Sequence, residues 1–364
     1  MKIFFQEKTK VEIPTQQTNY IVGSDLLAKL DGILTKHNMQ YSSFLILSDK
    51  KAFSLFGDKI ITSLQKLGKP VITSTIVSSE QNKELNKVTE IVKPYFQQGF
   101  NRNTCLICLG GGIITDIGGF IGSILLRGID CVLLPTTLLA QIDAAIGGKT
   151  GVNFSMGKNI YKNMLGDFKQ PALVISDVDT LTTLPEKEIR NGLGEMVKYW
   201  IGWEKPSFDE LLTIASSPKS EELAQIINMC QKIKIETIKK DPQDILGERE
   251  KLNLGHTIGH SIEGASNGKL SHGEAVSIGL VSAAKLSLWM DMLSDDVFEN
   301  ILKNIISLGL PIQVKDIDKR EVLSAMSLDK KGGTFVLIKD FGSLITGVKV
   351  EEELVKKVIS EVVL

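Results

Sequence analysis

The sequence predicts two units: an α/β domain built on a parallel, doubly wound, Rossmann-like sheet, followed by a mainly α-helical domain. In the first half, short apolar runs alternate with amphipathic stretches of helical periodicity, which is typical of parallel strands joined by helices. From about Leu184 this alternation stops, and long amphipathic stretches follow one another. We therefore expect an α/β domain over residues 1–180 and a mainly helical domain over residues 181–364.

The predicted strands of the first domain are short apolar runs of the kind that is buried on both faces of a sheet. These runs are FLILSD (44–49), VITSTIV (71–77), TCLICL (104–109), CVLLP (131–135) and ALVISD (172–177). Helical stretches such as FGDKIITSLQKLG and ELNKVTEIVKPYF separate them. In the second half, we expect helices at EELAQIINMCQKIKIETIKK and GEAVSIGLVSAAKLSLWM and a strand at GTFVLIKD (333–340). A crevice between the two domains is the expected place for a ligand.

The composition is typical of a soluble globular protein. Of the 364 residues, 43% are hydrophobic and 23% are charged, and the formal net charge of −1 gives no basic excess for binding nucleic acid or a membrane surface. The first residues, MKIFFQEKTK, do not resemble a signal segment, and no run approaches the roughly 18 apolar residues of a spanning helix. The four cysteines do not suggest a disulfide framework, so we expect a cytoplasmic protein in which Cys105 and Cys108 pack in a core.

A glycine-rich turn follows the predicted strand TCLICL. Gly110, Gly111 and Gly112 leave room for a ligand to approach the backbone, and the helix expected after them would offer free N–H groups to a phosphate or pyrophosphate. The spacing is not G-x-G-x-x-G, so the turn alone does not predict a standard dinucleotide site. Glycines that serve only a tight turn and close helix packing are the alternative.

Polar residues follow the next predicted strand. Thr136 and Thr137 stand at its carboxyl end, where open α/β sheets bind ligands. Asp143 lies in an otherwise apolar run, where a carboxylate needs either a partner or a function. Lys149 and Lys158 both follow glycines, and lysines beside such flexible turns suit phosphate groups.

Three of the four histidines fall within LNLGHTIGHSIEGASNGKLSHGEAV. His256 and His260 are four residues apart and so would lie on one face of a helix, and His272 follows after a segment whose glycines can reverse the chain. Two histidines and a carboxylate with an open coordination position form a known type of catalytic zinc site. The clustering predicts a metal site, and the residues alone leave three acids as possible ligands: Glu195, Glu263 and Glu274.

Several longer motifs resemble those of one enzyme family. The chain contains, in the order and approximate spacing found in 3-dehydroquinate synthases, the motifs GGGIITDIGGF, PTTLLAQIDAAIGGKTGVNF, GKN, GLGEMVKY, LNLGHTIGH, HGEAV and MSLDKK. The resemblance runs from about Glu80 to Lys331. These enzymes are sugar phosphate cyclases, and their fold resembles that of glycerol dehydrogenases and iron-dependent alcohol dehydrogenases.

The resemblance implies that the chain converts 3-deoxy-D-arabino-heptulosonate 7-phosphate into 3-dehydroquinate and phosphate, on the shikimate route to chorismate and the aromatic amino acids. Bound NAD would take a hydride from the substrate, permit phosphate elimination and return the hydride before an aldol addition closes the ring. A divalent metal ion, Zn²⁺ or Co²⁺, would act as a Lewis acid on substrate oxygens. The family is usually dimeric, which implies a homodimer.

The resemblance also implies roles for individual residues. The metal ligands would be Glu195, His256 and His272. The catalytic residues would be Asp143, Lys149, Lys198, Asn253 and His260. The substrate-binding residues would be Arg127, Asn159, Lys234, Arg249 and Lys330. The NAD-binding residues would be Glu80, Lys83, Gly110, Gly111, Gly112, Asp116, Thr136, Thr137, Lys149, Lys158, Thr180 and Thr183.

The pair Lys234 and Arg249 bears on the choice among cyclases. An arginine can bind a carboxylate through two parallel hydrogen bonds, and the heptulosonate carries a carboxylate that a neutral sugar phosphate such as sedoheptulose 7-phosphate lacks.

Three alternative functions remain: another sugar phosphate cyclase, a polyol dehydrogenase that releases NADH, and a regulator that binds NAD or metal without catalysis. Arg127 is a residue that would act across a subunit boundary.

Two segments depart from the family pattern. GKNIYKNMLGDFKQP is about four residues longer than the usual segment. Counting forward from the GGKTG turn selects Lys158 and Asn159, which we favour, whereas counting back from MLG selects Lys162 and Asn163.

The second departure concerns an acid before Arg249. The family commonly has a glutamate four residues earlier, where this chain has Ile245. Asp244 or Glu248 would serve instead after a shift of one residue.

Overall fold

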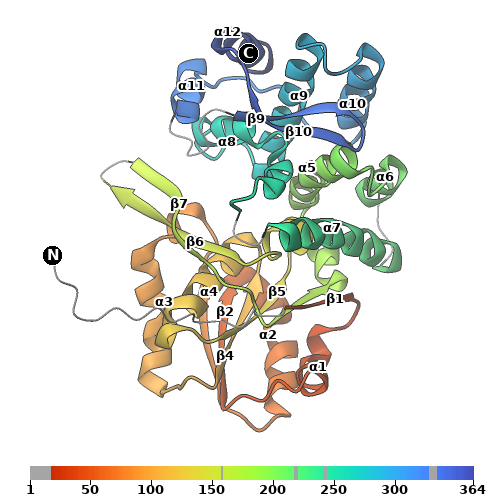
Figure 1. The fold of residues 1–364 in the computed structure, drawn as a ribbon. Coiled ribbons are helices and arrows are strands. Elements are labelled where there is room, and N and C mark those ends of the chain that lie inside the picture. Colours follow the sequence, from red (N-terminus) through yellow and green to blue (C-terminus); the bar gives the residue numbers. More distant parts are fainter. Residues whose placement is uncertain (1–17, 157–158, 217–219, 242–243, 328–333) are drawn as a thin grey trace, which may run out of the picture.

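The fold was obtained as a computed structural model, in which the described residues are 18–156, 159–216, 220–241, 244–327 and 334–364. Within them, the first half of the chain forms a parallel sheet of strand order β1-β8-β5-β4-β2-β3 (Figure 1). The strands are β1 (Asn19–Gly23), β2 (Ser43–Asp49), β3 (Val71–Ile76), β4 (Thr104–Gly110), β5 (Asp130–Pro135) and β8 (Leu173–Asp177). The expected Rossmann-like sheet is confirmed, and β1 is a strand that the sequence did not predict.

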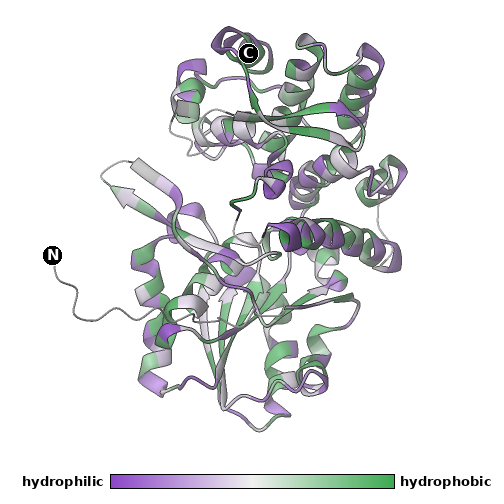
Figure 2. Cartoon of the chain, in the orientation of Figure 1, coloured by the Kyte–Doolittle hydropathy of each residue, from purple (hydrophilic) through white to green (hydrophobic). Residues whose placement is uncertain are grey.

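Helices cover both faces of this sheet. Along β2, Leu45 and Leu47 point into one apolar core with α3 and α4, whereas Phe44 and Ile46 point into another core with α1 and α2. These helices are α1 (Leu30–Lys36), α2 (Lys50–Gln65), α3 (Leu85–Gln98) and α4 (Gly112–Ile124). Figure 2 shows hydrophobic residues concentrated in the strands between them. Burial on both faces explains why the strand sequences are continuous apolar runs.

The two cysteines of the C-x-x-C motif lie on opposite faces of β4. Cys105 belongs to the core beneath α1 and α2, and Cys108 belongs to the core beneath α3 and α4. Burial raises the pKa of the Cys105 thiol well above its usual value. The two sulfur atoms therefore cannot act together on one metal ion, and both serve the core.

Short helical turns connect the strands and carry many of the candidate residues. They are η1 (Leu27–Lys29), η2 (Glu80–Asn82), η3 (Leu125–Arg127), the π-helical turn η4 (Ala140–Ala144), η5 (Val178–Thr183) and η6 (Glu248–Asn253). A hairpin that the sequence did not predict, β6 (Lys149–Met156) with β7 (Asn159–Phe168), packs against α4. In Figure 1 this hairpin rises from the sheet towards the helical half.

The second half is mainly helical, as predicted. Its helices are α5 (Glu186–Trp203), α6 (Phe208–Ser216), α7 (Ser220–Lys240), α8 (His256–Ala265), α9 (His272–Trp289), α10 (Asp295–Ser307), α11 (Lys319–Ser327) and α12 (Glu352–Val362). An antiparallel pair, β9 (Thr334–Asp340) and β10 (Ser343–Lys349), packs among them. No helix in the described part of the chain is long and apolar enough to cross a membrane.

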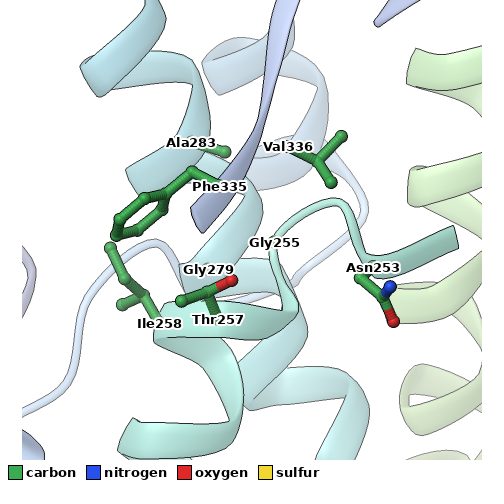
Figure 3. A pocket seen from close by; sticks show the side chains of 8 residues that line it. All are labelled: Asn253, Gly255, Thr257, Ile258, Gly279, Ala283, Phe335 and Val336. Carbon is green, nitrogen blue, oxygen red and sulfur yellow. The ribbon is translucent and has the colours of Figure 1, made fainter. Parts of the chain in front are cut away.

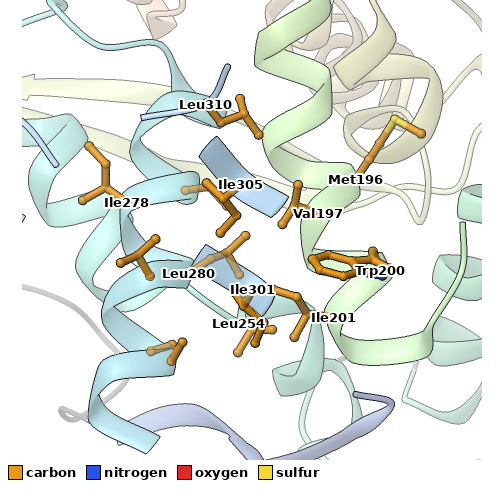
Figure 4. Packing of buried hydrophobic residues seen from close by; sticks show 14 of the residues in the cluster. Met196, Val197, Trp200, Ile201, Leu254, Ile278, Leu280, Ile301, Ile305 and Leu310 are labelled. Atoms are coloured by element: carbon orange, nitrogen blue, oxygen red, sulfur yellow. The ribbon is translucent and has the colours of Figure 1, made fainter. Parts of the chain in front are cut away.

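Helix α9 is the centre of the helical half. It packs against α5, α8, α10, α12 and β9, and most of its residues are buried. Figure 4 shows Val197 and Trp200 of α5 together with Leu280 of α9 and Ile301 of α10 in the resulting apolar core. Helix α7 joins the two halves, because it contacts η4 and β1 and its Ile238 is buried in the core of the α/β half.

Candidate active site and metal centre

The three candidate metal ligands come from three helices and meet at one place. Glu195 lies in α5, and His256 and His272 are the first residues of α8 and α9. Glu195 Oε1 lies 3.1 Å from His256 Nε2 and 2.8 Å from His272 Nε2. The Glu195 residue is only 1% exposed. One buried carboxylate oxygen that faces two imidazole nitrogens is a donor set suited to Zn²⁺ or Co²⁺.

Glycines allow these helices to approach closely enough. A Cβ on Gly194 would meet the carbonyl oxygen of Gly273 at 2.1 Å, and a Cβ on Gly273 would meet that of Asn191 at 1.9 Å. Between α8 and α9, a Cβ on Gly279 would meet the carbonyl oxygen of Gly255 at 1.9 Å. Each candidate ligand is therefore next in sequence to a glycine that lies at a contact between helix backbones. This accounts for the glycine beside the ligand in GLGE, LGH and HGE.

Both candidate ligand imidazoles are oriented through their Nδ1 atoms. His256 Nδ1 lies 3.0 Å from the carbonyl oxygen of Leu254, and because a carbonyl only accepts, this nitrogen carries the proton. His272 Nδ1 lies 3.0 Å from Glu263 Oε2, and a carboxylate partner of this kind fixes the ring orientation. The Nε2 atoms of both rings are thereby directed at Glu195 and at a shared metal position.

His260 lies beside this pair. Its ring centre is 5.0 Å from that of His256 and 5.5 Å from that of His272. Ligand atoms of the three histidines lie within 4.8 Å of one another. His260 is the exposed member of the three, so it remains accessible to a bound molecule.

A buried ion cluster centred on Asp143 adjoins the metal position. Lys198 Nζ lies 3.0 Å from Asp143 Oδ2 and 2.5 Å from Glu195 Oε2. Tyr199 donates a hydrogen bond of 2.7 Å to Asp143 Oδ2, and Lys234 contacts Oδ1 of the same carboxylate. Burial alone would raise the pKa of Asp143, but Lys198 and Lys234 hold it below its usual range. Asp143 is therefore ionised and fixes two ammonium groups.

Gln141 holds the turn that carries Asp143. Its Nε2 donates to the carbonyl oxygens of Pro135 and Asp177, each at 3.0 Å, which lie at the carboxyl ends of β5 and β8. Gln231 of α7 donates in turn to the carbonyl oxygen of Gln141 at 2.8 Å. Both glutamines are essentially fully buried, so η4 is tied to the sheet and to α7 at once.

A second polar cluster lies near the start of α4. Lys83 Nζ donates to Asp116 Oδ2 at 2.5 Å and to Asn163 Oδ1 at 2.6 Å. Glu80 accepts from Asn153 Nδ2 at 2.9 Å. Burial raises the pKa of Asp116, although Lys83 opposes this shift. The structure thus joins three of the expected cofactor-side residues, Glu80, Lys83 and Asp116, to the hairpin.

The glycine turn between β4 and α4 is a narrow one. A Cβ on Gly111 would come within 3.0 Å of Thr137 Cγ2, and a Cβ on Gly112 within 3.2 Å of Ala144 Cβ. The backbone N–H of Thr136 donates to the carbonyl oxygen of Gly110 at 2.9 Å. The turn, the residues after β5 and the N-terminus of α4 therefore form one closely packed cradle of backbone. These contacts fit glycines that serve a tight turn and close helix packing, and the free N–H groups at the start of α4 also suit a phosphate group.

Lys149 and Arg249 bring the two halves together at a further point. Lys149 Nζ lies 2.5 Å from Asp244 Oδ2, and Asp244 adopts a φ of 59°. Of the two candidate acids near Arg249, the Asp244 side chain is 19% exposed and that of Glu248 is 45% exposed, so Asp244 is the more buried one. Arg249 is 2% exposed, and its guanidinium lies 5.6 Å from the centre of the Phe168 ring.

Comparisons with known proteins identify the family of the chain. The model of the 3-dehydroquinate synthase N-terminal domain matches residues 73–191, and that of the C-terminal domain matches residues 192–332. The 3-dehydroquinate synthase of Thermodesulfovibrio yellowstonii is 38% identical over 98% of this chain and 100% of the relative. That of Desulforamulus reducens is 33% identical over 97% of this chain and 99% of the relative. The chain belongs to the 3-dehydroquinate synthase family.

Solved structures share the fold of this family member. The 2-epi-5-epi-valiolone synthase of Streptomyces hygroscopicus, with NAD⁺ and Zn²⁺ bound, superimposes with a TM-score of 0.86 at 25% identity, over 98% of this chain and 99% of the other. A 2-deoxy-scyllo-inosose synthase complexed with carbaglucose-6-phosphate, NAD⁺ and Co²⁺ superimposes with a TM-score of 0.84 at 24% identity, over 94% and 96%. The similarity to the 2-deoxy-scyllo-inosose synthase is evidence for the fold alone.

In this member of the 3-dehydroquinate synthase family, the lengthened segment contains β7 of the hairpin. Asn163 lies within β7 and contacts Lys83, whereas Asn159 is the first residue of the strand and pairs with Met156. Lys158 falls outside the described residues. The structure therefore brings Asn163 to the polar cluster near α4.

Arg127 lies away from the other candidate residues. It is exposed in η3, which follows the last turn of α4, whereas the glycine cradle adjoins the first turn. A helix of 13 residues is about 20 Å long, so Arg127 does not reach the site of its own chain.

The remaining candidates have varied positions. Asn253 lines a small pocket between α8, α9 and β9 with Thr257 and Phe335, and no metal-ligand candidate lines it (Figure 3). Thr180 is 2% exposed, and its hydroxyl donates to the carbonyl oxygen of Asp177 at 2.7 Å, while Thr183 donates to that of Thr180. Lys330 falls outside the described residues.

Sequence reasoning missed several residues of the site. Gln141 is a polar residue inside an apolar run, which is the signal that singled out Asp143, and the same signal would have found it. Asn153 lies in TGVNFSM and carried no such signal. Tyr199 adjoins Lys198 in MVKYW and carried no signal of its own. Only the packing of α5 against η4 reveals that its hydroxyl meets Asp143.

Proposed function

We propose that the chain is a 3-dehydroquinate synthase, a lyase that converts 3-deoxy-D-arabino-heptulosonate 7-phosphate into 3-dehydroquinate and phosphate on the shikimate route. One observation carries the proposal: the meeting of Glu195, His256 and His272 with the ion cluster around Asp143, beside the glycine cradle of the α/β half. Relatives of this activity match nearly the whole chain, which supports it.

A divalent metal ion fits the donor set. Glu195 would bind it through Oε1, and His256 and His272 would bind it through the Nε2 atoms that face Glu195 Oε1 at 3.1 Å and 2.8 Å. When bound, Zn²⁺ or Co²⁺ supplies Lewis acidity towards substrate oxygens. His260, one helical turn from His256 and exposed, would contact the substrate instead of the metal.

NAD fits the cradle at the carboxyl ends of β4 and β5. The N-terminus of α4, which begins at Gly112, offers free N–H groups and favours the negative charge of a pyrophosphate. When bound, NAD accepts a hydride and returns it. Lys83 and Asp116 would orient the cofactor from one side, and their contact with Asn163 supports placing the active-site asparagine there and not at Asn159.

The substrate carboxylate would be bound by Lys234 and Arg249. Arg249 is buried and lies next to the GGK turn. A Cβ atom added to Gly147 would be 3.5 Å from Arg249 Nη2. A desolvated guanidinium interacts strongly with a carboxylate through paired hydrogen bonds. Lys198 and Lys234 are both paired with Asp143, which fixes the positions of their amino groups beside the proposed substrate position.

A homodimer is part of the proposal. Arg127 is too far along α4 to serve its own chain, and it would contact the substrate phosphate of a second copy. Lys149, Lys330 and Asn253 would complete the substrate side, with Asp244 in place of the missing glutamate because it contacts Lys149. We place the enzyme in the cytoplasm.

Phosphate release by the purified protein tests the function. The protein is loaded with Zn²⁺ or Co²⁺ and a catalytic amount of NAD, and phosphate is measured with 3-deoxy-D-arabino-heptulosonate 7-phosphate or with sedoheptulose 7-phosphate. We expect release from the first substrate alone, without net formation of NADH.

Each other outcome identifies an alternative. Release from sedoheptulose 7-phosphate alone would assign a different cyclase and remove the role of Lys234 and Arg249 as a carboxylate pair. Net NADH formation with a polyol would assign a dehydrogenase. Metal and NAD binding without turnover of either sugar phosphate would contradict the proposal.

A further inference from the structure

The hairpin β6–β7 contains a bulge at its centre. The strand register shifts between Val152 and Phe154, so that Asn153 stands opposite the three residues 162–164. Asn153 Oδ1 accepts the backbone N–H of Asn163 at 3.0 Å, and Asn163 adopts a φ of 53°. Bulges of this kind change the direction of the side chains around them.

The bulge directs two neighbouring side chains to different halves of the molecule. Asn163 accepts from Lys83 at 2.6 Å on the cofactor side. Lys162 Nζ donates to Glu263 Oε1 of α8 at 2.8 Å. The other oxygen of this carboxylate, Oε2, lies 3.0 Å from His272 Nδ1. A continuous set of polar contacts thus leads from the hairpin to a candidate metal ligand.

We propose that Lys162 is a positioning residue for the metal centre and acts through Glu263 on the ring of His272. Glu263 fixes the tautomer and orientation of His272, and Lys162 restricts the rotation of the Glu263 carboxylate. The metal centre of the helical half is therefore completed by a residue of the α/β half. This inference rests on the metal centre of the proposed function but not on its substrate.

The burial of the two groups sets the expected size of the effect. The Glu263 side chain is 19% exposed, and that of Lys162 is 43% exposed. Carboxylates that orient a ligand histidine typically change metal affinity by about 10- to 100-fold when removed. A partly exposed ion pair contributes less, so loss of Lys162 should weaken metal binding roughly two- to fivefold.

Metal affinity measured by competition with a chelator tests the inference, with the absorption spectrum of bound Co²⁺ as a second readout. We expect Lys162→Met to weaken Co²⁺ and Zn²⁺ binding and to change the Co²⁺ spectrum, and Lys162→Arg to restore both. Glu263→Gln should have the larger effect. In the double variant, the loss should equal that of Glu263→Gln alone, because Lys162 acts through Glu263.

Lys87→Met is the control, because the Lys87 side chain is 41% exposed, close to the value of Lys162, and forms an ion pair with Glu90 on α3, away from the metal ligands. It should leave metal affinity unchanged. If Lys162→Met also leaves affinity and spectrum unchanged, or if its effect multiplies with that of Glu263→Gln, the inference is wrong while the metal centre stands. If the unmodified protein binds no metal, both the metal centre and the inference are wrong.

Discussion

The two halves of the site bring their groups together in different ways. In the α/β half, Gly110 and Thr136 meet because β4 and β5 run side by side, at the spacing of about 4.8 Å that any sheet imposes. In the helical half, Glu195, His256 and His272 meet because glycine backbones of three helices touch. The first arrangement depends on regular backbone hydrogen bonds, and the second depends on the absence of a few methyl groups.

This difference predicts that the helical half is the more sensitive of the two. A change to a ligand or to its neighbouring glycine should damage the metal centre while the cofactor cradle stays intact. Changes in the hairpin, which contacts both halves, should have smaller effects.

The largest effect is expected for His256→Ala. Lewis-acid stabilisation contributes several kcal/mol, so its loss should reduce turnover by roughly a thousandfold or more. NAD binding, measured by calorimetry, should change less than about twofold, because the cradle belongs to the other half. His37→Ala replaces the one histidine outside the cluster and should retain full turnover. Normal activity of His256→Ala would refute the metal assignment.

A smaller but still large effect is expected for Gly273→Ala. Its Cβ would lie 1.9 Å from the carbonyl oxygen of Asn191, so α5 and α9 must separate. Overpacking of this kind typically lowers the free energy of unfolding by about 1–3 kcal/mol, and metal affinity should fall with it. Chemical denaturation and metal titration measure the two quantities.

Gly264→Ala is the control for this prediction. Gly264 lies in α8 with no atom within 4 Å of an added Cβ, so alanine should raise the free energy of unfolding by up to about 1 kcal/mol. Equal behaviour of the two variants would show that the close helix contacts do not set the geometry of the centre.

The smallest effect of the three concerns the hairpin. Asn163→Ala removes one of the two side-chain acceptors of Lys83, and the resulting displacement of cofactor-side groups should lower kcat/KM by roughly ten- to a hundredfold. Asn159→Ala should change kcat/KM less than about twofold. Steady-state kinetics at varied NAD concentration measure both, and the opposite order would return the active-site role to Asn159.

Five of the six strands of the sheet could be predicted, and in β4 and β8 the reason is that burial on both faces leaves continuous apolar runs. The sixth, β1, is only partly buried and was missed. The hairpin β6–β7 could not be predicted in this way. Its strands combine glycines, charges and exposed apolar residues such as Met156, so neither a continuous run nor a clean alternation marks them. Only the pairing of the strands with each other, over α4, makes them strands.

The acids of the metal site illustrate the same limit. The residues alone left Glu195, Glu263 and Glu274 as equal candidates, and only the family resemblance selected Glu195. In the structure, Glu195 faces both Nε2 atoms, Glu263 contacts Nδ1 of His272, and Glu274 caps α9 by accepting from the Ser271 N–H at 2.8 Å. These roles depend on how three helices cross, which spacing along the chain does not encode.

The glycine contacts set where each ligand residue lies, whichever donor atom its side chain carries. Backbone atoms at the glycines fix where α5, α8 and α9 meet, and buried apolar side chains such as Val197 and Leu280 hold the helices together. Selection for a different metal could therefore exchange donor atoms at 195, 256 or 272 and keep the scaffold. The glycines beside them have no such freedom, so in this fold it is the residues without side chains that evolution can vary least.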